Sequence, residues 1–111
     1  MIAVVAPAGP LRDALVAQLG DEALRLAPDD PGALVSALGG VQRMVLACDD
    51  AVVAADVVAA AEMAHVYHCV TVGEVAALSG SSVRWTVVPP GDAEEVAAAA
   101  ARALTAPPVS D

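Results

Sequence analysis

Three acidic side chains stand directly after strand-like segments of this sequence, a position from which carboxylates can take up and release protons. Asp49 and Asp50 follow the apolar run 41–47, and Glu74 follows the run 65–72. A carboxylate beside a second carboxylate keeps its proton to higher pH, which suits a general acid or base. Acidic residues in the same place also cap helices and interact favourably with the helix dipole. The sequence therefore leaves Asp49, Asp50 and Glu74 as candidate catalytic residues or as ordinary caps.

A second group of residues has the chemistry to bind an anion. Gly9 lies in a turn between the apolar run 2–6 and the helical pattern of 11–19. The free backbone N–H groups of a helix N-terminus attract phosphate, and Arg12 in the first turn adds a guanidinium. Asp29 lies about 20 residues after Gly9, where a dinucleotide-binding domain carries the acid that contacts a ribose hydroxyl. Gly9, Arg12 and Asp29 are therefore the candidate cofactor-binding residues.

The glycine spacing of this turn is incomplete. A phosphate-binding turn of this kind has glycines at positions 6, 9 and 12, because the backbone must approach the phosphate and the helix must pack closely on the strand. Here these positions hold Ala6, Gly9 and Arg12. The turn is either an ordinary strand-to-helix connection with a surface arginine or a residual anion site.

The histidines and cysteines do not have the arrangement of a metal site. Strand alternation puts His65 and Cys69 on one face of the fourth strand and His68 on the other. Cys48 ends the third strand, which the expected strand order separates from the fourth by two others. We therefore expect neither a disulfide nor a zinc site. A polar strand face bearing Tyr67 or His68 suits contact with a second subunit.

Strand-like and helix-like segments alternate along the whole chain, which is typical of a parallel α/β fold. The expected strands are 2–6, 23–27, 41–47, 65–72 and 83–88, and the expected helices are 11–19, a short one from Pro31, 51–64, 74–79 and 93–104. Right-handed crossovers predict a Rossmann-like three-layer sandwich with a five-stranded parallel sheet in the order 3-2-1-4-5 and helices on both faces. Residues 1–104 form one domain in this interpretation, and 105–111 form a flexible tail.

Composition excludes several classes of function. The 111-residue chain carries a net charge of −9 and has no lysine, so neither nucleic acid nor an anionic membrane is an expected partner. The missing lysine also removes every mechanism that needs a lysine amine. Hydrophobic residues make up 58% of the chain, which favours a homodimer through the alanine-rich helices 51–64 or 93–104. Without a signal peptide, a membrane-length apolar run or a disulfide framework, a cytoplasmic location is expected.

Four stretches together resemble one known family. They are ALGGVQRMVLACDD (37–50), EVAALSGSSVRW (74–85), VRWTVVPPG (83–91) and DAEEVAAAAARALTAP (92–107). Their order is similar to that in the short-chain dehydrogenase/reductase superfamily, in its atypical NmrA-like NAD(P)-binding branch, where a Trp-Thr-Val segment before Pro-Gly forms a late strand. The resemblance implies a Rossmann-like fold and NAD(P) as the candidate cofactor.

The departures from that family bear on activity. Its members are usually at least twice as long, so the resemblance implies a strongly truncated relative. The family's catalytic Tyr-x-x-x-Lys pair cannot exist without lysine, and Tyr67 falls on a strand instead of a helix. The glycine turn matches at Gly9 only.

Three functions follow from these observations. The first is a truncated NAD(P)-binding-like protein that has lost redox chemistry and acts as a small-molecule-binding or auxiliary protein. Its composition, rich in Ala, Val and Arg, is typical of a high-GC bacterium and fits secondary metabolism. The second is a non-redox biosynthetic isomerase, cyclase or lyase that uses the acidic residues. The third is an NAD(P)-dependent oxidoreductase. If the chain is an enzyme, acid–base chemistry is favoured over hydride transfer.

Overall fold

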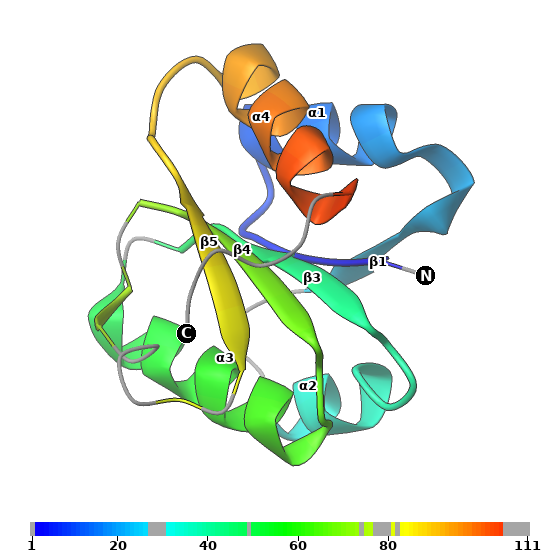
Figure 1. Cartoon of the computed structure of the whole chain (residues 1–111), viewed down its shortest axis with the longest axis vertical. Helices are drawn as coiled ribbons and strands as arrows, with labels where there is room; N and C mark the ends of the chain where they lie inside the picture. The colour runs from blue at the N-terminus through cyan, green and yellow to red at the C-terminus, as the bar shows by residue number, and fades with distance from the viewer. Residues whose placement is uncertain are drawn as a thin grey trace.

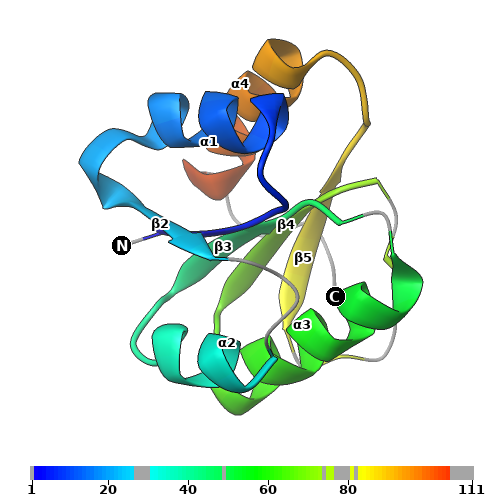
Figure 2. The same ribbon diagram turned by 180° about the vertical axis from the view of Figure 1, so that it is seen from behind.

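Strands and helices alternate along the residues that the computed structural model describes, which are 2–26, 31–48, 50–73, 75–76, 81 and 83–105. In chain order the elements are β1 (Ile2–Val5), α1 (Pro10–Leu19), a short 3-10 helix (Gly20–Glu22), β2 (Ala23–Leu26), α2 (Pro31–Ala37), β3 (Arg43–Leu46), α3 (Ala51–Met63), β4 (His68–Val72), β5 (Arg84–Val88) and α4 (Ala93–Thr105). The sheet lies between two helical layers, with α1 and α4 on one face and α2 and α3 on the other (Figures 1 and 2).

The layer of α1 and α4 is held to the sheet by small and branched side chains. Helix α1 begins at Pro10, whose fixed φ suits the first helical position, and ends before Gly20 at φ 66°. Leu15 of α1 is fully buried. In α4 the buried residues recur every three or four positions, which places them on one stripe: Val96, Ala97, Ala100 and Leu104. Alanines on this stripe let the helix backbone approach the sheet closely.

The opposite layer uses a helix that is apolar on nearly every side. In α3, Ala54, Val57, Val58, Ala60 and Ala61 are buried against the sheet and α2. Small residues also occupy the exposed side of α3, so its amphipathic pattern is weak. The position of α3 is set by the sheet that it covers and by its N-cap residue, Asp50.

All five strands run parallel, and the predicted Rossmann-like α/β class is confirmed. The predicted strand order 3-2-1-4-5 is wrong, because the sheet has the order β2-β1-β3-β4-β5. Right-handed crossovers permit both orders, so handedness alone does not decide between them. Burial decides: Met44, Val45 and Leu46 of β3 are buried on both faces, as an interior strand requires, whereas β2 carries the exposed Arg25, which an edge strand tolerates.

The fourth strand begins later than predicted, at His68 instead of residue 65. Residues 65–67 instead form the turn that follows α3. His65 adopts φ 59°, while its N–H donates to Glu62 O and that of Val66 donates to Ala61 O. This is a left-handed helix stop of the kind that glycine usually makes. Most of the predicted helix 74–79, and all of the tail after Thr105, lie outside the described residues.

His68 is packed inside the chain, which corrects the expectation that it marks a subunit contact; Tyr67 beside it is 54% exposed. The His68 side chain is 1% exposed, and its Nε2 lies 2.9 Å from Thr86 Oγ1. Arg43 and Arg84 flank it in register on the neighbouring strands. Burial, and to a smaller extent the charge of Arg43, lowers the pKa of His68 from its ordinary 6.5.

Acid should therefore weaken the fold through His68. Because its pKa is lower in the folded chain, the unfolded chain binds the proton first as the pH falls through about 6.5. The free energy of unfolding should be level above neutral pH and decline below about 6.5 until the pH reaches the folded pKa. Urea unfolding between about pH 8 and pH 5 measures this decline.

Two variants separate His68 from the carboxylates that also titrate. In His68→Gln the decline should shrink, because glutamine carries no charge at any pH. In His65→Gln, which alters an exposed histidine, the decline should persist. Equal slopes in the two variants would assign the acid sensitivity to other groups.

Candidate functional site

A cleft of about 270 Å³ opens where the central strands end. Its lining comes from the β1–α1 turn and from the ends of β3 and β4: Ala6, Pro7, Ala8, Gly9, Pro10, Leu11, Ala47, Cys48 and Val72. Successive crossovers reverse direction between β1 and β3, so the helices that follow these strands lie on opposite faces and leave a crevice. Open α/β sheets bind their ligands in such a crevice, at the carboxyl ends of the strands. The position of the cleft makes it the candidate binding site.

Gly9 leaves the backbone at the start of α1 accessible from the cleft, because it has no side chain. It is the N-cap of α1, with an extended conformation at φ 161°, which residues with side chains also adopt. A Cβ added to Gly9 would meet no atom within 4 Å. The missing side chain therefore leaves space beside the helix N-terminus, which is the space that an anion at this turn would use.

The donors at this helix end are few. Asp13 is the first residue of α1 whose N–H bonds within the helix, to Gly9 O at 3.1 Å. Pro10 has no N–H, so the N–H groups of Leu11 and Arg12 are the two within α1 that precede this bond. Two backbone donors and the positive end of the helix dipole suit one phosphate or carboxylate group.

The Arg12 side chain does not line the cleft. It is half-buried on the first turn of α1, and its Nε is buried without a hydrogen-bond partner in the described structure. Gly9 and Arg12 share the turn at the start of α1, and their predicted role as cofactor-binding residues stays a prediction. The Arg12 guanidinium as an anion ligand stays a prediction.

Asp50 is engaged as a helix cap. Its Oδ1 accepts hydrogen bonds from Val52 N at 2.9 Å and Val53 N at 3.3 Å, at the start of α3. These bonds use the carboxylate to satisfy the free end of the helix. A proton-transfer role for Asp50 stays a prediction, and Asp49, Glu74 and Asp29 lie outside the described residues.

Cys48 and Val72 line the cleft, although neither is among the candidate site residues named from the sequence. Both stand at the carboxyl ends of neighbouring strands, and the adjacency of β3 and β4 brings them to one cleft. Both residues end predicted strands, which indicates the carboxyl edge of the sheet. The incorrect strand order, however, kept the third and fourth strands apart, so it did not bring the two residues together. Cys48 is partly exposed and its Sγ donates to Asp50 O at 3.7 Å, while burial raises the pKa of Cys69 to about 12. Both cysteines are free thiols.

The described residues contain neither a metal-binding cluster nor a membrane-spanning helix. Among them, no three His, Cys, Asp or Glu side chains come together in a way that would hold a metal ion. No helix in this part of the chain has the length and apolar character needed to cross a membrane.

Comparison with solved structures identifies the architecture. A Citrobacter sp. triphenylmethane reductase, solved with NADP(H), superposes with a TM-score of 0.81 at 17% identity, covering 99% of this chain and 67% of the reductase. An NADPH-dependent quinone oxidoreductase from Escherichia coli, solved with NADPH, gives a TM-score of 0.79 at 17% identity, covering 95% of this chain and 65% of that enzyme.

This chain has the fold of these two reductases. At this level of identity the similarity shows shared architecture. No protein-family model matches the sequence, and no curated protein is similar enough to it to count as a relative.

The role of Asp50 as the N-cap of α3 can be tested by substitution. Replacing Asp50 by Ala should lower the free energy of unfolding by about 1 kcal/mol, because two backbone N–H groups lose their acceptor. Asp50→Ser should restore most of the loss. Asp56→Ala, at an exposed position within the same helix, is the matched control and should change stability little. Urea unfolding of the three variants gives the comparison, and an Asp50→Ala variant as stable as the control would contradict the capping role.

Proposed function

We propose that this chain is a shortened relative of the NmrA-like short-chain dehydrogenases that binds a phosphorylated nucleotide without carrying out redox chemistry. NADP(H) is the first candidate ligand, because the two reductases that share the fold were solved with it. The observation that carries the proposal is the open space beside Gly9, at the helix N-terminus that enters the crevice between β1 and β3.

The strand order is consistent with the shortened ancestry, and it is also an order that intact doubly wound sheets adopt. A Rossmann sheet in its common form has six strands in the order 3-2-1-4-5-6. Removing the third strand leaves 2-1-4-5-6, which becomes the observed β2-β1-β3-β4-β5 when the strands are renumbered. The loss affects the edge beyond β2 and preserves the crevice that binds the ligand.

The residues present fit the phosphate part of a nucleotide better than the whole dinucleotide. The volume of about 270 Å³ lies just below the range of about 300 to 1,000 Å³ for small-molecule sites. Leu11 N–H and the Gly9 space suit one phosphate group, and the apolar walls suit the adjoining sugar or ring. Arg12 in place of a glycine, and Pro10 with no N–H, leave fewer donors than a full dinucleotide turn provides.

The residues that line the cleft also support the proposal that the chain has lost redox chemistry. A bound NADP(H) supplies a hydride, and its acceptor needs a proton from the protein or from solvent. Among the described lining residues, Cys48 has the only ionisable side chain, and the rest are small and apolar. The chain has no lysine to form the superfamily's Tyr-x-x-x-Lys pair. A binding or auxiliary role in bacterial secondary metabolism fits a cleft with this lining.

The experiment is a titration with NADPH and NADP⁺, followed by nucleotide fluorescence and calorimetry. The unaltered chain should bind with micromolar to millimolar Kd and should not oxidise NADPH in the presence of quinones or triphenylmethane dyes. In Gly9→Ala the Kd should rise about tenfold, because the new methyl group occupies the phosphate space. Its melting temperature should fall only slightly, because that methyl group contacts no protein atom and only the N-cap preference for glycine over alanine is lost.

Gly91→Ala is the matched control, since Gly91 lies in the described loop before α4 and does not line the cleft. It should bind nucleotide as the unaltered chain does. Bound nucleotide should also slow the reaction of Cys48 with a thiol reagent. No binding at millimolar nucleotide would refute the proposal, and equal affinity of the two glycine variants would place the nucleotide elsewhere.

A further inference from the structure

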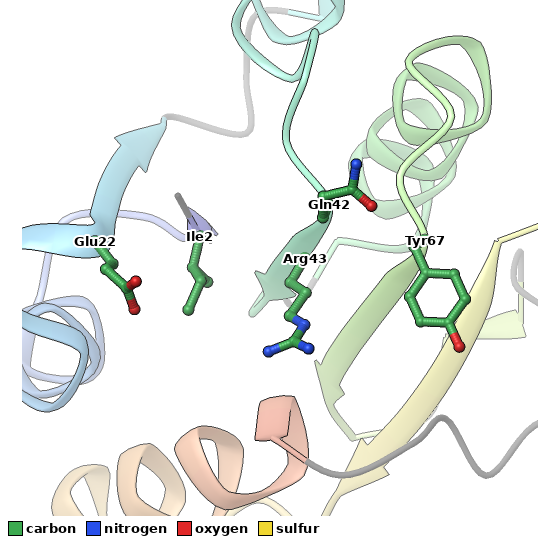
Figure 3. Close-up of a pocket in the computed structure, with 5 residues that line it drawn as sticks. All are labelled: Ile2, Glu22, Gln42, Arg43 and Tyr67. Carbon is green, nitrogen blue, oxygen red and sulfur yellow. The ribbon is translucent and has the colours of Figure 1, made fainter.

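The amino-terminal edge of the sheet, at the end remote from the cleft, has a depression of its own. Its volume is about 520 Å³, and five residues line it: Ile2, Glu22, Gln42, Arg43 and Tyr67. Figure 3 shows their side chains arranged across the amino-terminal ends of β2, β1, β3 and β4. Side chains line this depression, whereas the carboxyl-end cleft is lined largely by backbone and small apolar groups.

Two opposite charges face the depression without neutralising each other. Glu22 directly precedes β2 and Arg43 begins β3, while Ile2 of β1 lies between them in register with Ala23 and Arg43 (Figure 3). Within the described part of the chain neither the Glu22 side chain nor the Arg43 side chain forms a hydrogen bond or an ion pair. Both groups remain available to an external ligand.

The register fixes the backbone spacing beneath the two charges. Neighbouring strands lie about 4.8 Å apart, so two strand spacings separate the backbones that carry Glu22 and Arg43 by about 10 Å. Both side chains are long and exposed, so their charged ends can approach the ammonium and carboxylate groups of one small ligand from opposite sides.

The two charges together exclude ligands that carry a charge of only one sign. A phosphate on Arg43 would face the carboxylate of Glu22, and a simple amine on Glu22 would face the guanidinium of Arg43. A molecule that carries both charges meets neither repulsion. Its net charge of zero also avoids the unfavourable field that a chain of charge −9 presents to free anions. Ile2 provides an apolar floor, and the 54% exposed Tyr67 offers a ring surface for a short carbon skeleton.

We propose that this depression binds a small zwitterionic amino acid, with the ligand carboxylate on Arg43 and its ammonium group on Glu22. The Gln42 amide adds a neutral donor and acceptor at the rim. The site is separate from the nucleotide cleft, because the two lie at opposite ends of the same strands. It therefore does not depend on the function proposed for that cleft.

The first test compares ligands on the unaltered chain by two-dimensional amide NMR. The probes are glycine, L-alanine, β-alanine and γ-aminobutyrate, against acetate and ethylammonium as single-charge analogues at equal ionic strength. At least one zwitterion should shift the amide signals of Ile2, Arg43 and Tyr67 saturably at millimolar concentration. The two single-charge analogues should bind about tenfold more weakly, because each lacks one charge-assisted hydrogen bond.

The second test uses charge-removing variants with matched controls. Arg43→Gln and Glu22→Gln should each raise the Kd of the bound zwitterion about tenfold. Arg25→Gln and Glu94→Gln remove exposed charges that do not line the depression and should leave the Kd unchanged. The His68 imidazole signal gives an independent readout, because a carboxylate on Arg43 offsets the charge that acts on His68.

Three results would overturn the proposal. They are the absence of saturable shifts at tens of millimolar with every zwitterion, acetate binding as strongly as the amino acids, and control variants that lose as much affinity as Arg43→Gln. The ligand comparison needs no substitution, so the proposal stays testable even if a variant fails to fold. Nucleotide titration of the same samples reports on the cleft separately.

Discussion

The structure depends on three strands that are covered on both faces. Ile2–Val5, Met44–Leu46 and Cys69–Thr71 are buried throughout, because α1 and α4 lie against one side of the sheet and α2 and α3 against the other. A strand in this environment can carry almost nothing but apolar side chains. Strands with arginines are therefore found at the edges or have the arginine at a strand end. This constraint sets the strand order, and the strand order sets the position of the crevice.

The same constraint separates the chemistry of the two ends of the sheet. At the carboxyl end, the strands lead into turns of small residues, and backbone groups near Gly9 supply the polar contacts. At the amino end, β2, β3, β4 and β5 each begin with or follow a charged or polar side chain, including Glu22, Arg43 and Arg84. Ligands at the two ends would be recognised by different means: at one end by amides and the helix dipole, at the other by side-chain charges.

Much of the fold could be predicted because local chemistry decides it. Gly20 ends α1 with a positive φ, and Asp50 caps α3, as their residue types indicate. The strand order could not be read in the same way, since both possible orders use right-handed crossovers and differ only in which strand is buried. Arg25 in the second strand carried that information. The start of β4 was missed because His65, a residue that strands accept, adopts a left-handed conformation here.

The candidate site was predictable to a similar extent. The turn at Gly9 follows from the change of pattern between an apolar run and a helix, and the structure places the cleft there. Cys48 and Val72 become lining residues only through the adjacency of β3 and β4, which no short stretch of sequence encodes. Helix capping and proton transfer both use an acidic residue at the end of a strand, so sequence alone could not assign Asp50 to one of the two roles.

The position of β2 at the sheet edge has a consequence for how the chain behaves at high concentration. An edge strand presents an outer row of backbone donors and acceptors that can template the strand of another molecule. In β2 this row is only four residues long and contains the exposed Arg25. A charge at this point makes stacking of such edges unfavourable, because each added copy would bring a further guanidinium beside the last. Arg25 thereby disfavours the addition of a further strand at this edge of the sheet.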